Sequence, residues 1–119
     1  MTVCFDASFL MLAAKFHLDI ISETERLLLK RIQFNVLDIV VGELEGLSRR
    51  PGAAGRDARV ALEVISARKI RRVSSGEQSN ADMALIEASG QPGIIVATAD
   101  LDLRRAIRKR GKPVIIFRE

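Results

Sequence analysis

Two short apolar runs near the carboxyl end of the sequence bracket one helical pattern. Residues 94–98 and 114–117 are dominated by Ile and Val, and a basic stretch with helical spacing lies between them. Strands buried on both faces show such near-continuous apolar runs, so the pattern predicts strand, crossover helix and parallel strand. Because Asp100 directly follows the first of these strands, it falls where open α/β sheets bind their ligands.

The same alternation extends along the rest of the chain. Apolar runs predict three more strands, at residues 2–5, 34–39 and 70–73, and apolar positions at helical spacing predict the segments between them. The expected helices are residues 9–16, 22–32, 40–47, 58–67, 81–88 and the basic helix 104–110. This order predicts an α/β fold: one domain, residues 1–119, with a mainly parallel central sheet of about five strands flanked by helices.

Local signals place the ends of several helices. Ser8 is the expected cap of the first helix, and the capping-box pattern at residues 22–25 marks the start of the second. Residues 49–56 are expected to form a loop, since Pro51-Gly52 and Gly55 are helix breakers. The second helix should turn its apolar residues toward the core: Leu27, Leu28, Leu29 and Ile32.

Size and composition narrow the class of protein. The chain has 119 residues, of which 48% are apolar, enough for one domain with a modest core. It has neither an apolar run near the roughly 18 residues that a membrane span needs nor a signal-peptide pattern, so we expect a cytoplasmic protein without a membrane partner. The lone Cys4 lies in an apolar strand and is expected to be a buried thiol rather than a nucleophile.

The formal net charge of +4 comes with clustered arginines. A basic surface favours a polyanionic partner, although a solvated surface rich in Arg is the simpler interpretation. Tyr and Trp are absent from the sequence, so stacking platforms for bases are scarce. The candidate contacts to a nucleic acid are Arg49, Arg50, Arg104, Arg105 and Arg108.

Acidic residues recur where predicted strands end. Asp6, Glu43, Asp82 and Asp100 each follow a strand or begin the next helix, so the fold should gather them at one edge of the sheet. Crowded carboxylates repel one another unless a cation neutralises them, and hard oxygen ligands without Cys or His select Mg²⁺ or Mn²⁺. Such an ion can hold a phosphodiester and activate a water molecule. Asp102 follows Asp100 by two residues. Three interpretations of it stay open: a fifth metal ligand, an acid that orients a ligand, or an ordinary acid in the first turn of the helix.

Four segments in this order, residues 3–10, 40–47, 81–86 and 96–100, resemble the PIN-domain ribonucleases over essentially the whole chain. The resemblance implies a parallel-sheet α/β fold and endonucleolytic cleavage of RNA that depends on Mg²⁺ or Mn²⁺. On this resemblance Asp6, Glu43, Asp82 and Asp100 match the acidic site residues, which hold the metal, and Ser8 and Thr98 match the polar residues that support them.

Within that family, residues 43–47, 98–105 and 110–115 look more like stand-alone archaeal proteins related to ribosome-biogenesis nucleases. That similarity implies precursor ribosomal RNA as the substrate. VapC-type toxins share the acids, and for such a toxin the partner would be an antitoxin. A homodimer is a further expectation for so small a domain.

Other interpretations stay open. Asp82 and Asp100 stand at helix starts, where a carboxylate stabilises a helix without any catalytic role. A PIN-like module that binds RNA without cutting it is the first alternative function, because Ala99 stands where the family usually has Asn before the fourth acid. A phosphoacceptor receiver-like domain is the second, but it would need an acidic pair after the first strand, where only Asp6 is present.

Overall fold

The computed structural model describes residues 1–28 and 31–117, and in these residues the predicted order of strands and helices is confirmed. The strands are β1 (Thr2–Phe5), β2 (Gln33–Leu37), β3 (Arg71–Val73), β4 (Ile94–Thr98) and β5 (Val114–Ile116). The helices are α1 (Ala7–Lys15), α2 (Ile20–Leu28), α3 (Asp38–Ser48), α4 (Gly52–Ala67), α5 (Ala81–Ser89) and α6 (Leu101–Lys109).

The strands form one parallel sheet in the order β3-β2-β1-β4-β5. The central strand β1 pairs with β2 on one side and with β4 on the other, and its Val3 and Phe5 have no exposed surface. The chain moves from β1 outward to β3 and then returns to build β4 and β5 on the opposite side. The direction in which successive strands are added to the sheet therefore reverses between β1 and β4, although all strands stay parallel. Ligands of open α/β sheets bind beyond the carboxyl ends of the strands at such a reversal.

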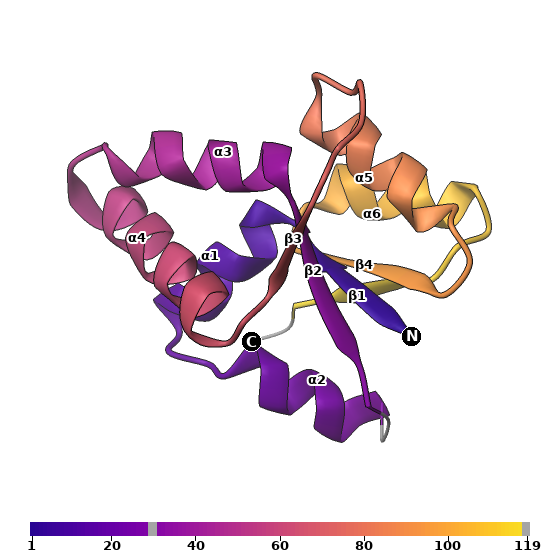
Figure 1. Cartoon of the computed structure of the whole chain (residues 1–119), viewed down its shortest axis with the longest axis horizontal. Coiled ribbons are helices and arrows are strands. Elements are labelled where there is room, and N and C mark those ends of the chain that lie inside the picture. Colours follow the sequence, from indigo (N-terminus) through magenta and orange to yellow (C-terminus); the bar gives the residue numbers. More distant parts are fainter. Residues whose placement is uncertain (29–30, 118–119) are drawn as a thin grey trace.

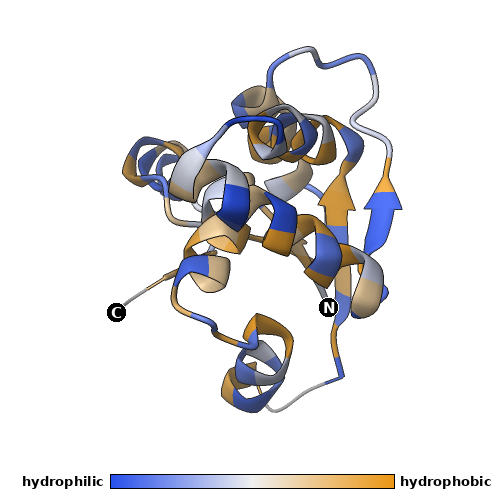
Figure 2. Ribbon diagram, turned by 90° about the vertical axis from the view of Figure 1, so that its left-hand side faces the viewer, coloured by the Kyte–Doolittle hydropathy of each residue, from blue (hydrophilic) through white to orange (hydrophobic). Residues whose placement is uncertain are grey.

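Helices cover both faces of the sheet. Parallel strands need right-handed crossovers, so the reversal of direction moves the later helices to the other face. Figure 1 shows α1, α3 and α4 grouped on one side of the strands and α5 and α6 on the other. Figure 2 shows the helices as mixtures of hydrophilic and hydrophobic residues, as expected for helices that turn one side to the core.

Aromatic rings join the sheet to its neighbours. Phe5 stacks on Phe34 and on Phe9, with ring centroids 5.6 Å and 5.7 Å apart. Phe117 contacts both Phe9 and Phe16 at 5.8 Å. All five Phe residues of the sequence therefore contact another Phe ring.

The thiol of Cys4 is buried in β1. Burial, and after it the negative charge of Asp6, raises the pKa of this thiol to about 12. It is protonated at neutral pH and packs as a small apolar side chain, as expected from the sequence.

In the part of the chain that the structure describes, no helix has the length and apolar character needed to cross a membrane.

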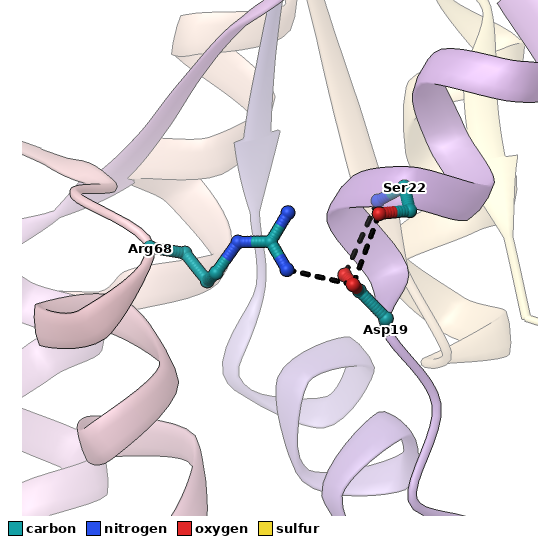
Figure 3. A network of polar contacts seen from close by, with 3 residues as sticks. All are labelled: Asp19, Ser22 and Arg68. Carbon is teal, nitrogen blue, oxygen red and sulfur yellow. Dashed lines mark hydrogen bonds and ion pairs between the residues drawn. The ribbon is translucent and has the colours of Figure 1, made fainter.

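The predicted start of the second helix is wrong. α2 begins at Ile20, because Asp19 rather than Ser22 satisfies its first backbone donors: the Ser22 N–H donates to Asp19 Oδ1 at 3.2 Å. The Ser22 hydroxyl donates to Asp19 Oδ2 at 2.9 Å, and Arg68 Nη1 donates to the same oxygen at 2.6 Å. Figure 3 shows Asp19 between these two partners, so one carboxylate begins α2 and links it to the end of α4.

The predicted inward face and end of that helix are also corrected. Leu27 is 68% exposed, and Ile20, Ile21 and Thr24 are the buried residues of α2. Leu28 and Ile32 pack partly against the core as expected, but Arg31 and Ile32 belong to no helix. Leu29 lies outside the described residues.

Two further boundaries differ, one where β2 meets α3 and one where α4 begins. The predicted strand 34–39 begins at Gln33 and ends at Leu37, because α3 already begins at Asp38. The predicted loop 49–56 is confined to residues 49–51, because α4 begins at Gly52. Gly55 is not a breaker: a Cβ there would stand 1.8 Å from the Arg50 carbonyl oxygen, so glycine allows the first turn of α4 to pack against the preceding turn.

Candidate active site

Asp6 stands at the carboxyl end of the central strand and is only 6% exposed. It is the N-cap of α1: the Ala7 N–H donates to Asp6 Oδ1 at 2.8 Å. The prediction that Ser8 caps this helix is therefore wrong. An aspartate at the N-cap satisfies a backbone N–H donor that has no partner within the helix.

Two hydroxyl groups hold the other oxygen of Asp6. Ser8 Oγ and Thr98 Oγ1 each donate to Asp6 Oδ2 at 2.7 Å, and the two hydroxyl oxygens are 3.3 Å apart. The N–H of Ala99 donates to Ser8 Oγ at 3.1 Å, and that of Asp100 donates to Thr98 Oγ1 at 3.0 Å. The network joins the ends of β1 and β4, which are more than 90 residues apart in sequence, and leaves Asp6 little freedom to move.

Asp100 and Asp102 stand at the start of α6. Asp100 Oδ1 accepts from the N–H groups of Asp102 at 2.9 Å and of Leu103 at 3.3 Å, so Asp100 is the N-cap of this helix. Asp100 therefore does cap a helix, as the structural interpretation of this acid expects. The cap uses only Oδ1, and among the described residues Oδ2 has no hydrogen-bond donor. Asp102 is exposed in the first turn.

Glu43 and Asp82 approach this edge from α3 and α5. The pKa of Glu43 is raised, first by shielding of its carboxyl from water and then by the charges of Asp6 and Asp82. Shielding also comes first in raising the pKa of Asp82, followed by the charges of Asp100, Asp6 and Asp102. The five acids of the sequence prediction therefore lie close enough at one edge of the sheet to repel one another.

Sequence reasoning missed a contact that supports this arrangement. Ser75, in the loop before α5, donates its N–H to Asp38 Oδ1 at 3.0 Å and its hydroxyl to the same oxygen. Ser75 Oγ also accepts the Ile39 N–H at 3.1 Å. The loop that leads to Asp82 is thereby attached to the first turn of α3, the helix of Glu43. The signal in the sequence was a polar loop, residues 74–79, after a short strand. This signal does not indicate that Ser75 would bind Asp38.

The donor set fits a hard divalent cation in its chemistry. All five acids offer oxygen, and the nearby thiol of Cys4 is buried in β1 and protonated at neutral pH, so it is not expected to serve as a ligand. Among the described residues no three acidic, His or Cys side chains stand close enough together to hold one ion as they are. Glu43 and Asp82 are exposed, however, so core packing does not fix the positions of their side chains as it does for Asp6.

The predicted arginine contacts fall into two separate places. Arg104, Arg105 and Arg108 are on α6, whose first residue follows Asp100. Arg49 and Arg50 lie in the turn between α3 and α4, at the end of α3 that points away from the acids. Figure 1 shows this turn and α6 on opposite sides of the molecule.

A family model described as a PIN like domain matches residues 3–119. No curated protein matches the chain.

Three solved structures show the same fold. The PIN domain endonuclease Utp24 superposes with a TM-score of 0.84 at 24% identity, over 99% of this chain and 86% of that one. A domain of a functionally unknown protein from Methanocaldococcus jannaschii DSM 2661 has a TM-score of 0.67 at 20% identity, over 99% and 91%. VapBC2 from Rickettsia felis, solved with a DNA fragment from its promoter, has a TM-score of 0.64 at 14% identity, over 98% of both chains.

At these identities the structures establish a shared fold, while the family model spans nearly the whole sequence. The chain therefore belongs to the PIN-like domain family.

Proposed function

We propose that this protein is an endoribonuclease that depends on Mg²⁺ or Mn²⁺. The observation that carries the proposal is the meeting of carboxylates from separate segments around Asp6, with repulsion that raises the pKa of Glu43 and Asp82. Such repulsion costs folding stability, and a divalent cation would offset it. A shared fold with a PIN domain endonuclease supports the same activity.

Each side chain of the site would have a distinct part. Asp6, held by Ser8, Thr98 and the Ala7 N–H, provides a fixed oxygen ligand. Glu43 and Asp82 from the exposed side, and Asp100 through its Oδ2, would complete the ligand set. A metal ion bound there supplies positive charge to a phosphodiester and lowers the pKa of a coordinated water molecule.

The finer role we propose is maturation of precursor ribosomal RNA, which is the first substrate to test. It rests on the similarity of residues 43–47, 98–105 and 110–115 to stand-alone archaeal proteins related to ribosome-biogenesis nucleases. A VapC-type toxin would differ in having an antitoxin partner, and the shared fold with VapBC2 supports that role less directly.

The direct test is cleavage of RNA by wild type and by variants that remove one charge each. Glu43 and Asp82 are exposed, so Glu43→Gln and Asp82→Asn should fold normally and lose about 100-fold or more in cleavage rate with Mg²⁺ or Mn²⁺. Glu45→Gln, two residues further along α3, is the matched control and should cleave like wild type. Equal cleavage by all variants would contradict the assignment.

A second candidate is a PIN-like module that binds RNA without cutting it. The observation that favours it is that, within residues 1–28 and 31–117, no three potential ligands are already arranged around one point. Salt-dependent RNA binding by wild type, without metal-dependent cleavage and without a metal-induced rise in melting temperature, would identify this function.

A further inference from the structure

One face of α6 carries a continuous cationic stripe. Its residues recur at the i, i+3, i+4, i+7 and i+8 spacing of one helix face, opposite the buried Leu103 and Ile107. The ion pairs of the described residues join Arg26 to Glu23 and Arg68 to Asp19, so none of them neutralises this face. The stripe lines a hollow of about 430 Å³ and consists of Leu101, Arg104, Arg105, Arg108 and Lys109.

The stripe begins at the acidic site. Arg104 is half-buried and also lines a small cavity of about 50 Å³ together with Thr98 and Asp100. Thr98 is the residue that donates to Asp6, and Asp100 caps α6. Arg104 therefore borders both the acidic site and the cationic hollow.

Neutralisation of the helix dipole does not explain the whole stripe. Arg108 and Lys109 lie in the last turn, where cations stabilise the negative end of a helix. Arg104 and Arg105 are the fourth and fifth of the nine residues, before the last turn, where the dipole offers a cation nothing. The helix dipole therefore gives no reason for the two cations nearest the site.

We propose that a single-stranded segment of the RNA runs from the acidic site along the α6 stripe. The inference deepens the proposed function, on which it rests, by giving that substrate a path across the surface. The stripe from Leu101 to Lys109 is about 12 Å long at 1.5 Å per residue. That length matches about three nucleotides of a stacked strand at 3.4 Å each.

The composition of the stripe favours a single strand over a duplex. Guanidinium planes stack on unpaired bases as well as pairing with phosphates, whereas a lysine acts only as a point charge. The sequence has no Tyr or Trp, and every Phe contacts another Phe ring, so Arg104, Arg105 and Arg108 are the flat cationic groups beside the site. Leu101, which is 58% exposed, offers an apolar contact to a base.

The chain provides a matched control for charge. Arg105 and Arg108 are exposed on the stripe, and Arg49 and Arg50 are exposed in the turn between α3 and α4. Replacing either pair by Gln removes two positive charges, so the two variants have the same net charge as each other. Only the place of the loss differs, and the two places lie on opposite sides of the molecule (Figure 1).

The test is fluorescence anisotropy with a labelled single-stranded RNA of about 12 nucleotides and its duplex, in chelator, over about 50 to 200 mM KCl. Chelator stops metal-dependent cleavage, so binding is measured even if the proposed nuclease activity fails. The double variant Arg105→Gln/Arg108→Gln should bind the single strand about tenfold more weakly. Its slope of log affinity against log salt should shrink by about 1.4, at about 0.7 for each lost contact. Arg49→Gln/Arg50→Gln should bind like wild type.

Equal losses in the two double variants, or none in the α6 variant, would overturn the path, as would tighter binding of the duplex. With Mg²⁺ or Mn²⁺ present, the α6 variant should have a higher KM for cleavage and a kcat within about twofold of wild type. The reason is that the two replaced arginines bind parts of the RNA that are remote from the phosphate being cleaved. A wild type that binds the single strand through α6 but cleaves nothing would refute the nuclease and leave the path standing.

Discussion

Thr98 concentrates several tasks in one fully buried side chain. Its β-branched carbon suits the end of a buried strand, while its hydroxyl donates to Asp6 and accepts from the Asp100 backbone. A buried hydroxyl that lost either partner would carry the cost of an unmade hydrogen bond. Thr98 therefore both stabilises the end of β4 and positions the carboxylate of Asp6.

We expect Thr98→Val to lower the free energy of unfolding by about 1 to 3 kcal/mol, because Asp6 loses a donor and the Asp100 N–H an acceptor in a buried place. The cleavage rate should fall as well, since Ser8 would be the one remaining hydroxyl donor to Asp6 Oδ2 among the contacts described above. Urea unfolding and an RNA cleavage assay measure the two effects. Thr98→Ser keeps the hydroxyl and should retain most of the activity; a loss as large as that of the Val variant would show that the hydroxyl is not what matters.

At the scale of elements, the turn between α3 and α4 shows how a glycine can be a packing residue. Gly55 lies inside the first turns of α4, where a side chain would meet the carbonyl oxygen of Arg50. Gly46, near the end of α3, has nothing within 4 Å of where its Cβ would be. The two helical glycines look alike in sequence but differ in their surroundings.

Gly55→Ala should destabilise the protein by about 1 to 3 kcal/mol, because the backbone around Arg50 must move to admit the methyl group. Gly46→Ala should instead stabilise it by about 0.5 to 1 kcal/mol, since alanine loses less entropy in a helix. Thermal or urea unfolding of both variants measures the difference. Changes of equal sign and size would contradict the packing of α4 against the Arg50 carbonyl.

For the whole molecule, two sets of carboxyl groups give opposite pH dependences. Hydrogen bonds from neighbouring side chains lower the pKa of Asp19 and Asp38, so their stabilising contribution is present at neutral pH and is lost as the pH falls through their folded-state pKa. Glu43 and Asp82 have a raised pKa. They favour folding most when protonated, and that contribution is lost as the pH rises through their folded-state pKa.

A bound divalent cation should reverse the second effect. At about pH 7.5, Mg²⁺ or Mn²⁺ at 100 times its Kd should add about 2.7 kcal/mol of stability, a rise of several degrees in Tm. Because protons compete for Glu43 and Asp82, the rise should shrink as the pH is lowered to about 5.

Asp82→Asn should raise the metal-free Tm by removing a repelling charge and should weaken the response to metal, while Asp57→Asn on α4 should respond like wild type. Differential scanning fluorimetry measures all of these shifts. An equal response to metal by both variants would place the ion elsewhere.

The alternation of apolar runs and helical periods was enough for the order of elements and for the expectation that acids meet at one edge. Boundaries were harder because they depend on partners outside the local pattern. α2 begins early because Asp19 is also held by Arg68, 49 residues away. α4 begins early because Gly55 can lie against Arg50.

What the amino-acid sequence determined by itself is local and periodic: which segments are strands or helices, and that an acid follows each relevant strand end. The tertiary structure decided which oxygens are held and which are free. Asp6 is fixed by Ser8 and by Thr98, which ends the neighbouring strand β4 but lies 92 residues away in sequence, whereas Glu43 and Asp82 stay exposed. Hydrogen bonds and charge repulsion depend on distances in space, and those distances exist only once the sheet has brought its strand ends together.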